Sequence, residues 1–170
     1  MGDNYGDNRV HRNMMRMEFD SISNNESLAR MAVASFILPL NPTLDEINDV
    51  KTAVSEAVTN SIIHGYEKFK GTVFLKCERR DDLIIVTIKD NGVGIENVEK
   101  AMEPLYTTKP FEGRAGMGFM FMDVFMDDLD VQSSKGYGTT VTMKKRIGRR
   151  GQNERSECGD IGTDHECSKG

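Results

Sequence analysis

The feature that most constrains this chain is an amphipathic segment that begins at Thr43 and ends near Gly65. Thr43 and Glu46 have the spacing of a capping box, which starts a helix, and a glycine such as Gly65 commonly ends one. Between them, six residues recur at helical spacing and therefore lie on one side of the helix; they are Ile47, Val50, Val54, Val58, Ser61 and Ile62. Glu56 and Asn60 are four residues apart, so they share a face roughly opposite this stripe. The segment predicts a helix whose polar face carries a carboxylate and an amide.

The polar face of this helix has two interpretations. A carboxylate and an amide there are usually no more than solvated surface. A functional site is favoured by three glycine-containing motifs downstream, which are Asp90-Asn91-Gly92-Val93-Gly94, Gly113-Arg114-Ala115-Gly116-Met117-Gly118 and Gly138-Thr139-Thr140. Each motif alone is ordinary turn chemistry. All of them in this order within one small domain are hard to obtain by chance, so we favour the functional interpretation.

The rest of the chain alternates strand and helix patterns. Strands are predicted at residues 15–19, 71–77, 83–89, 129–133 and 139–145. Ser23 and Glu26 form a second capping box before a helix predicted at 27–38, and another helix is predicted at 119–127. Asp90 shares a strand face with Ile88 and the apolar residues before it, so its carboxylate ends an apolar face and needs a partner.

At this point the chain resembles a known family. Glu56-x-x-x-Asn60, Asp90-x-Gly92-x-Gly94, Thr107-Thr108-Lys109, Gly116-x-Gly118 and Gly138-Thr139-Thr140 match the ATP-binding pattern of the GHKL superfamily, the Bergerat fold. Residues 55–66, 105–110 and 116–127 are similar to the sporulation anti-sigma factors that are serine kinases. The resemblance implies an α+β domain over residues 13–147, a two-layer α/β sandwich whose mixed, mostly antiparallel sheet is covered by helices on one face. Residues 1–12 and 148–170 are expected to be disordered.

The resemblance also implies roles for individual residues, with ATP and Mg²⁺ as cofactors. Glu56 is the expected catalytic base, and Asn60 is expected to coordinate Mg²⁺ through its side-chain oxygen. Asp90 is expected to accept a hydrogen bond from the exocyclic amine of adenine, where Gly92 and Gly94 let the backbone approach the base. The remaining ATP contacts are expected from Thr107, Thr108, Lys109, Arg114, Gly116, Gly118, Thr139 and Thr140.

The first helix carries a candidate partner surface. Its core stripe is expected to consist of Leu28, Met31, Ala32 and Phe36. That choice leaves Val33 and Ile37 on the less buried side, beside Arg30. Exposed apolar residues are common and usually carry no meaning, but an arginine between aliphatic side chains also suits an interface. The resemblance favours the interface, with a sporulation sigma factor and an anti-anti-sigma factor as partners. It further implies a homodimer through the first helix and first strand.

These expectations combine into one function with several alternatives. We expect an anti-sigma factor that sequesters a sporulation sigma factor and, as a protein serine kinase, phosphorylates its anti-anti-sigma antagonist. The chain could instead act mainly by sequestration, with nucleotide as a conformational ligand, or as a GHKL ATPase switch with water as acceptor. A histidine-kinase catalytic domain is disfavoured, because no helical hairpin carrying an acceptor histidine precedes the domain. The P-loop and protein-kinase signatures are absent.

Composition limits the remaining classes. The 170 residues suit one domain, and the net charge of −5 argues against nucleic acid as the main partner. No apolar run is long enough to span a membrane and the polar start is no signal peptide, so a cytoplasmic protein is expected. Cys77 is expected to be a buried thiol, while Cys158, His165 and Cys167 lack typical zinc spacing. A basic run is interpreted as a solvated strand end; it comprises Lys144, Lys145, Arg146, Arg149 and Arg150.

Overall fold

The computed structural model describes residues 12–67, 69–103 and 117–148. Its sheet consists of β1 (Arg12–Asp20), β2 (Thr72–Arg80), β3 (Leu83–Lys89), β4 (Asp128–Ser134) and β5 (Gly138–Arg146). The order across the sheet is β1-β2-β3-β5-β4, and every neighbouring pair of these strands is antiparallel. The predicted antiparallel character is confirmed, and the described part of the sheet contains no parallel pair that would make it mixed.

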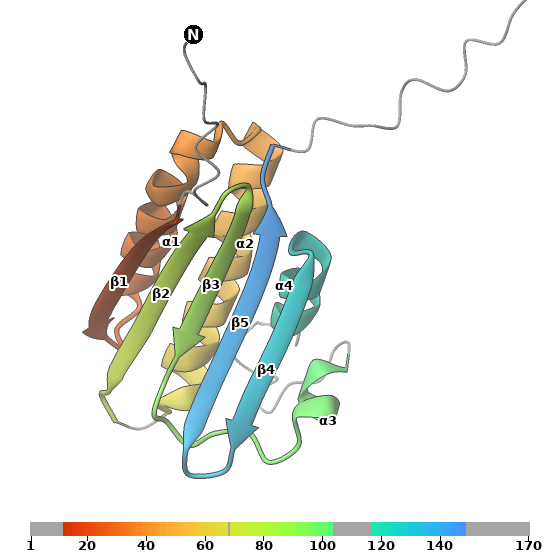
Figure 1. Ribbon diagram of the computed structural model, residues 1–170. Helices are drawn as coiled ribbons and strands as arrows, with labels where there is room; N and C mark the ends of the chain where they lie inside the picture. Colours follow the sequence, from red (N-terminus) through yellow and green to blue (C-terminus); the bar gives the residue numbers. More distant parts are fainter. Residues whose placement is uncertain (1–11, 68, 104–116, 149–170) are drawn as a thin grey trace, which may run out of the picture.

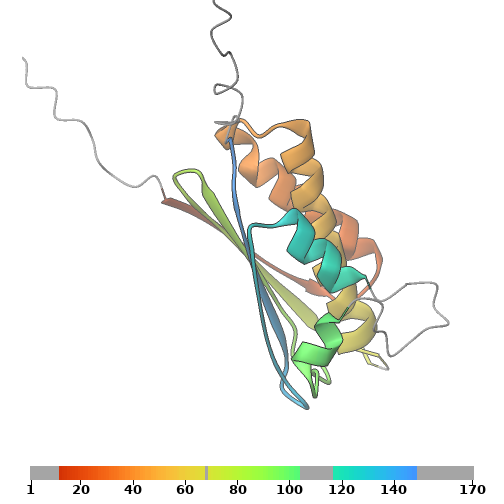
Figure 2. The ribbon, with the colours of Figure 1, turned by 90° about the vertical axis from the view of Figure 1, so that its right-hand side faces the viewer.

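The helices all lie on one face of this sheet, as Figure 1 shows from the front and Figure 2 from the side. They are α1 (Asn24–Ile37), α2 (Leu44–Asn60), α3 (Val98–Met102) and α4 (Gly118–Phe125), with a 3₁₀ turn η1 (Leu38–Leu40) and a π-helical turn η2 (Ser61–Gly65). This is the expected two-layer α+β sandwich. Within the described ranges, no helix is both long enough and apolar enough to cross a membrane.

The core lies between α2 and the sheet. Val50, Val54 and Val58 of α2 are fully buried, as their helical spacing predicts. The facing strand residues alternate with period two and include Leu75, Cys77, Ile84, Val86, Ile88, Val141 and Met143. Cys77 is a free, buried thiol, as expected, and burial raises its pKa to about 12. The sheet therefore presents one apolar face to the helices.

The opposite face of the sheet carries charged side chains. Glu78 on this face is only 4% exposed and is held by Lys76, by Arg80 at 2.9 Å and by Arg12 at 3.1 Å. Hydrogen bonds from Lys76 and Arg80 lower the pKa of Glu78 to about 2. No described helix covers this face, as the side view in Figure 2 shows. Ion pairs surround the buried carboxylate there.

The two predicted capping boxes have different outcomes. Thr43 Oγ1 accepts from the backbone N–H of Glu46 at 3.2 Å, and Glu46 Oε2 accepts from Thr43 N at 2.8 Å, so the box that starts α2 is confirmed. Ser23 has helical dihedral angles and makes no side-chain capping bond. The prediction of a second capping box is therefore wrong, because a serine must have extended geometry to reach the free N–H groups.

The orientation predicted for α1 is also wrong. Val33 and Ile37 are fully buried in the core, whereas Leu28 and Met31, expected in the core stripe, are each 53% exposed. Apolar residues occur nearly all round this helix, so periodicity alone did not identify its buried side. The helix packs through its smaller and β-branched residues, and Val33 and Ile37 do not lie on a partner surface of the described chain.

The predicted domain boundaries at residues 13 and 147 stay a prediction. At the edges of the described residues, β1 begins at Arg12, and Gly148 N donates to Glu46 Oε1 at 2.9 Å. The predictions for residues 1–11 and 149–170, including Cys158, His165 and Cys167, fall outside the described residues.

Candidate functional site

A cleft of about 980 Å³ lies where the C-terminal end of α2 meets α3, α4 and the start of β5. In Figure 1, α3 and the C-terminal end of α2 lie toward the lower end of the domain. Its volume is typical of a small-molecule site, for which about 300–1,000 Å³ is usual. Among the residues that line it are six of those predicted from sequence, namely Glu56, Asn60, Asp90, Gly94, Gly118 and Thr139. The fold therefore brings the separated sequence motifs together around one cavity.

The wall formed by α2 ends in a π-helical turn. Beyond Asn60 the helix widens into η2, and Tyr66 N donates to Ser61 O at 3.1 Å. Single π-turns inside or at the end of α-helices are frequent at functional sites. The loop after β3 lies directly on this turn, since Val93 N donates to Gly65 O at 2.8 Å. The widened turn thus connects Asn60 with the loop that carries Asp90.

The two glycines of that loop are required by the protein's own backbone. A Cβ atom at Gly92 would lie 2.1 Å from Gly65 O, which no side chain can tolerate. Gly94 has φ +68°, and a Cβ atom there would lie 2.0 Å from Ser134 O. From the sequence, we expected these glycines only to let the backbone approach the adenine base. Their packing against η2 and β4 holds Asp90 at the cleft.

Asp90 is buried and hydrogen-bonded, with only 2% of its surface exposed. Its Oδ1 accepts from the backbone N–H groups of Gly92 at 2.9 Å and Thr139 at 3.2 Å. Burial raises the pKa of this carboxyl, while hydrogen bonds from Gly92, Ser61 and Thr139 oppose the shift. The carboxylate therefore joins β3, β5 and η2, and it lines the cleft, where it can accept a hydrogen bond from a ligand.

Glu56 and Asn60 meet the start of α4. A Cβ atom added at Gly118 would lie 3.1 Å from Glu56 Oε2 and 3.2 Å from Asn60 Nδ2. These contacts are tighter than most real Cβ contacts, so any residue larger than glycine would require Glu56 or Asn60 to shift. Met117, the N-cap of α4, makes no side-chain capping bond. The first N–H groups of α4 are thus placed beside the carboxylate and the amide, an arrangement that suits an anionic ligand and its cation.

Some predicted site residues are not brought to the cleft. Thr139 lines the cleft, and Thr140 is the next residue of the same strand. Consecutive residues of a strand point to opposite faces of the sheet, so the side chain of Thr140 points away from the cleft. Thr140 therefore belongs to the charged face of the sheet with its cross-strand neighbour Lys89. The predicted lid residues Thr107, Thr108, Lys109, Arg114 and Gly116 lie outside the described residues.

Sequence reasoning missed several residues that support the cleft. Tyr66 is 5% exposed, and its hydroxyl donates to Thr72 O at 2.6 Å and accepts from Asn91 N at 2.9 Å. It therefore braces the loop that begins at Asp90. Lys100 lines the cleft from α3, whose first turn is capped by Asn97 Oδ1 at 2.8 Å from Lys100 N. The available signals were weak, namely a tyrosine next to a helix-ending glycine and an Asn-x-x-Lys sequence in a long loop.

Comparison with known families defines the class of the domain. Residues 23–145 match the family model of the histidine kinase-like ATPase domain, a domain type that binds ATP. The five-stranded antiparallel sheet, the helices on one of its faces and the cleft at the end of α2 fit this assignment. The protein is a member of the histidine kinase-like ATPase class.

Within this class, the chain is similar to anti-sigma F factors over nearly their full length. It is 58% identical over 136 residues to the anti-sigma F factor of Clostridium beijerinckii, covering 79% of this chain and 95% of that protein. The anti-sigma F factor of Clostridium botulinum (strain Eklund 17B / Type B) is 56% identical over 139 residues, covering 81% of this chain and 97% of that protein. The chain belongs to the anti-sigma F factor family.

A solved structure with the same fold supports the architecture. The RsbU and RsbW domains of a Mycobacterium tuberculosis protein match with a TM-score of 0.58 and 17% sequence identity. The match covers 79% of this chain and 32% of that chain. At this identity the similarity concerns the fold alone.

Proposed function

We propose that this chain sequesters a sporulation sigma factor in the cytoplasm and, with ATP and Mg²⁺, phosphorylates a serine of an anti-anti-sigma factor. Membership of the anti-sigma F factor family supports the two partners. The observation that carries the kinase activity is the placement of Glu56 and Asn60 against Gly118, in the same cleft as Asp90. A nucleotide whose base is held by Asp90 would extend its phosphates toward the start of α4.

Each of these groups has a chemical task that suits its position. Asp90 accepts a hydrogen bond from the amine of the base, and Asn60 offers a side-chain oxygen, the ligand type that Mg²⁺ prefers. When bound, Mg²⁺ supplies charge neutralisation on the phosphates. Glu56 accepts the proton of the serine hydroxyl as that oxygen bonds to the γ-phosphorus, and the bond to the ADP oxygen breaks. The N–H groups at the start of α4 stabilise negative charge on the transferred group.

The function is tested by incubating the purified chain with γ-labelled ATP, Mg²⁺ and purified anti-anti-sigma factor. We expect label on a serine of the partner, and none when magnesium is chelated. Release of labelled phosphate into water without labelled partner would instead support the ATPase switch. Label on a histidine would support the histidine-kinase alternative. In parallel, retention of the sigma factor by the immobilised chain measures sequestration, and its absence would contradict that part of the proposal.

Arg30 remains the best candidate for the partner surface after the correction of Val33 and Ile37. Its side chain is 39% exposed, and its guanidinium contacts Glu26 at 3.4 Å and Ser27 Oγ at 3.2 Å. It borders a small hollow between α1 and α2, lined by Arg30, Asn48, Lys51, Thr52 and Ser55. Ser55 also lines the nucleotide cleft. A partner docked at Arg30 would therefore lie beside the cleft in which its serine must react.

Charge reversal at this position is the corresponding prediction. Arg30→Glu is expected to weaken binding of one or both protein partners by about 2 kcal/mol or more, the size of an interface hot spot. ATP affinity is expected to be unchanged, because Arg30 is not among the residues described around the cleft. Titration calorimetry with each partner and with ATP measures both effects. Lys144→Glu, on the opposite face of the sheet, is the matched control. Normal binding of both partners by Arg30→Glu would remove this surface from the proposal.

We also propose that two copies of the chain associate through α1 and β1. β1 is nine residues long and, among the described strands, pairs only with β2, so its other edge can pair with another strand. Leu28 and Met31 on the adjoining helix are each 53% exposed and add apolar surface there. Sedimentation equilibrium measures this association, and a purely monomeric chain at working concentration would contradict it.

A further inference from the structure

A lysine occupies a position in the helix–sheet interface where an apolar residue is expected. Val141 and Met143 of β5 point toward the helices and are buried, so Lys145, two residues further, points the same way. Its side chain is only 13% exposed. The prediction that Lys145 belongs to a solvated strand end is therefore wrong. Lysine is seldom buried without a partner, so its contacts need an explanation.

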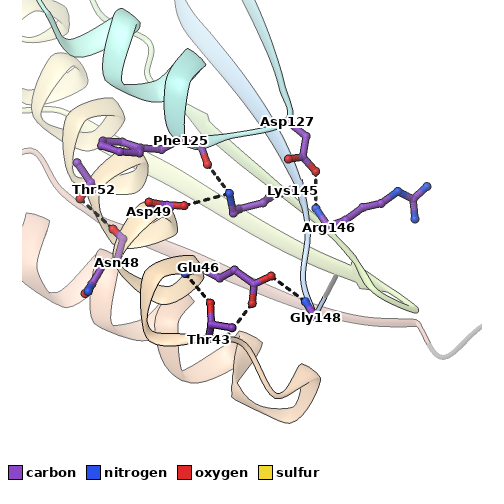
Figure 3. Close-up of polar contacts among 10 residues, drawn as sticks. All are labelled: Thr43, Glu46, Asn48, Asp49, Thr52, Phe125, Asp127, Lys145, Arg146 and Gly148. Atoms are coloured by element: carbon purple, nitrogen blue, oxygen red, sulfur yellow. Dashed lines mark hydrogen bonds and ion pairs between the residues drawn. The ribbon is translucent and has the colours of Figure 1, made fainter. Parts of the chain in front are cut away.

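The ammonium group of Lys145 joins two helices, as Figure 3 shows. Its Nζ donates to the carbonyl oxygen of Phe125 at 2.7 Å and lies 3.2 Å from Asp49 Oδ2. Phe125 is the last residue of α4, where carbonyl groups lack partners within the helix and a positive charge is favourable. Asp49 belongs to α2. One side chain of the sheet thus ties the C-terminal end of α4 to α2.

The opposite end of α4 meets the catalytic part of α2. Gly118, the first residue of α4, lies close against Glu56 and Asn60, where even a Cβ atom would come within 3.1 to 3.2 Å of their side chains. Two helical turns separate Asp49 from Glu56 on α2, and two turns separate Phe125 from Gly118 on α4, about 10.5 Å in each case. The two helices are therefore held in register at both ends, by Lys145 at one end and by close contact at the other.

We propose that Lys145 is a positioning residue for phosphoryl transfer, because it fixes α4 along α2 and so places the start of α4 beside Glu56 and Asn60. This inference rests on the proposed kinase function. Rates of oriented reactions are sensitive to misplacement of about 1 Å, for which losses near 10²-fold are known. Base recognition depends on Asp90, which is held by β3, β5 and η2 and not by α4. Loss of Lys145 should therefore affect the reaction more than nucleotide affinity.

The test compares two neighbouring lysines of the same strand. Lys145→Met keeps the length and apolar stem of the side chain but removes the ammonium group, and Lys144→Met is the control on the other face, where Lys144 pairs with exposed Asp128. With saturating ATP, Lys145→Met is expected to lower the single-turnover transfer rate about 10- to 100-fold while ADP affinity changes less than about threefold. Lys144→Met is expected to leave both unchanged. Lys145→Arg, which keeps the charge and the donors, is expected to recover part of the rate.

Amide hydrogen exchange separates failure of this inference from failure of the proposed function. Exchange at residues 121–125, whose N–H groups are bonded within α4, is expected to be faster in Lys145→Met and unchanged in Lys144→Met, whether or not the chain proves to be a kinase. Should Lys145→Met fold poorly, Asp49→Asn removes the charge of the partner with little change in shape and is expected to show the same pattern more weakly. A wild-type rate with wild-type exchange would overturn the inference. Equal losses of rate and of ADP affinity would also overturn it, because they would indicate a general structural role.

Discussion

Replacing Glu56 by glutamine is expected to slow phosphoryl transfer to the anti-anti-sigma factor by about 10²- to 10⁴-fold. Glutamine preserves the size of the side chain and its contact with the start of α4, but it cannot accept the proton of the attacking hydroxyl. Glu56 is half-buried on the polar side of α2, away from the core stripe, so folding should be retained. ATP affinity should also be retained, because the proposal assigns base recognition to Asp90 and not to Glu56.

The measurement is a rapid-quench, single-turnover assay at saturating ATP, with ATP affinity determined separately by calorimetry. Glu96→Gln provides the matched control, since Glu96 also lines the cleft but is largely exposed and pairs with Lys135 at 3.0 Å. Its transfer rate should equal that of the unmodified chain. Near-normal transfer by Glu56→Gln would reduce Glu56 to a structural residue and would leave the proton acceptor to be sought elsewhere in the cleft.

The parts of this site that sequence could predict are governed by local rules. The capping box at Thr43 and the spacing of Val50, Val54 and Val58 define where α2 begins and which side it buries. That orientation places Glu56 and Asn60 together on the polar side of α2, and the downstream glycine motifs and the family resemblance were needed to predict that this side lines a cleft. Strand periodicity likewise placed Asp90 at the end of a buried face. In each case, the pattern within one element determines the direction of the side chain.

The wrong predictions concern side chains whose burial depends on packing against a second helix or strand. α1 has apolar residues on nearly every side, and packing against α2 and the sheet selects the side with Val33 and Ile37. Thr140 follows Thr139 in the family motif, but the strand turns the two to opposite faces. Lys145 has the sequence of a solvated basic run, and only contacts with α2 and α4 show why it is buried. Such tertiary contacts cannot be read from the periodicity of one segment.

The second large effect is expected at the base-binding end of the cleft, where Asp90→Asn should weaken ATP and ADP binding alike by about 10- to 100-fold. Asparagine retains one oxygen for the N–H groups of Gly92 and Thr139, so the loop should keep its conformation. The other carboxylate oxygen is replaced by an NH₂ donor, which cannot accept a hydrogen bond from the amine of adenine. Loss of a hydrogen bond to a charged group costs about 1.5–3 kcal/mol, which corresponds to this range of affinity.

Inosine triphosphate is the matched ligand for this variant, because its base has a carbonyl oxygen where adenine has the amine. The buried Asp90 carboxylate of the unmodified chain should reject that oxygen, whereas the amide of Asp90→Asn can donate to it. The ratio of ATP affinity to inosine triphosphate affinity should therefore fall by a larger factor than the ATP affinity itself. Asn60→Ala is the comparison at the other end of the cleft and should weaken ATP more than ADP, because its role is through magnesium. Undiminished ATP affinity in both variants would exclude this cleft as the nucleotide site, since Asp90 and Asn60 are its two principal polar contacts in the proposal.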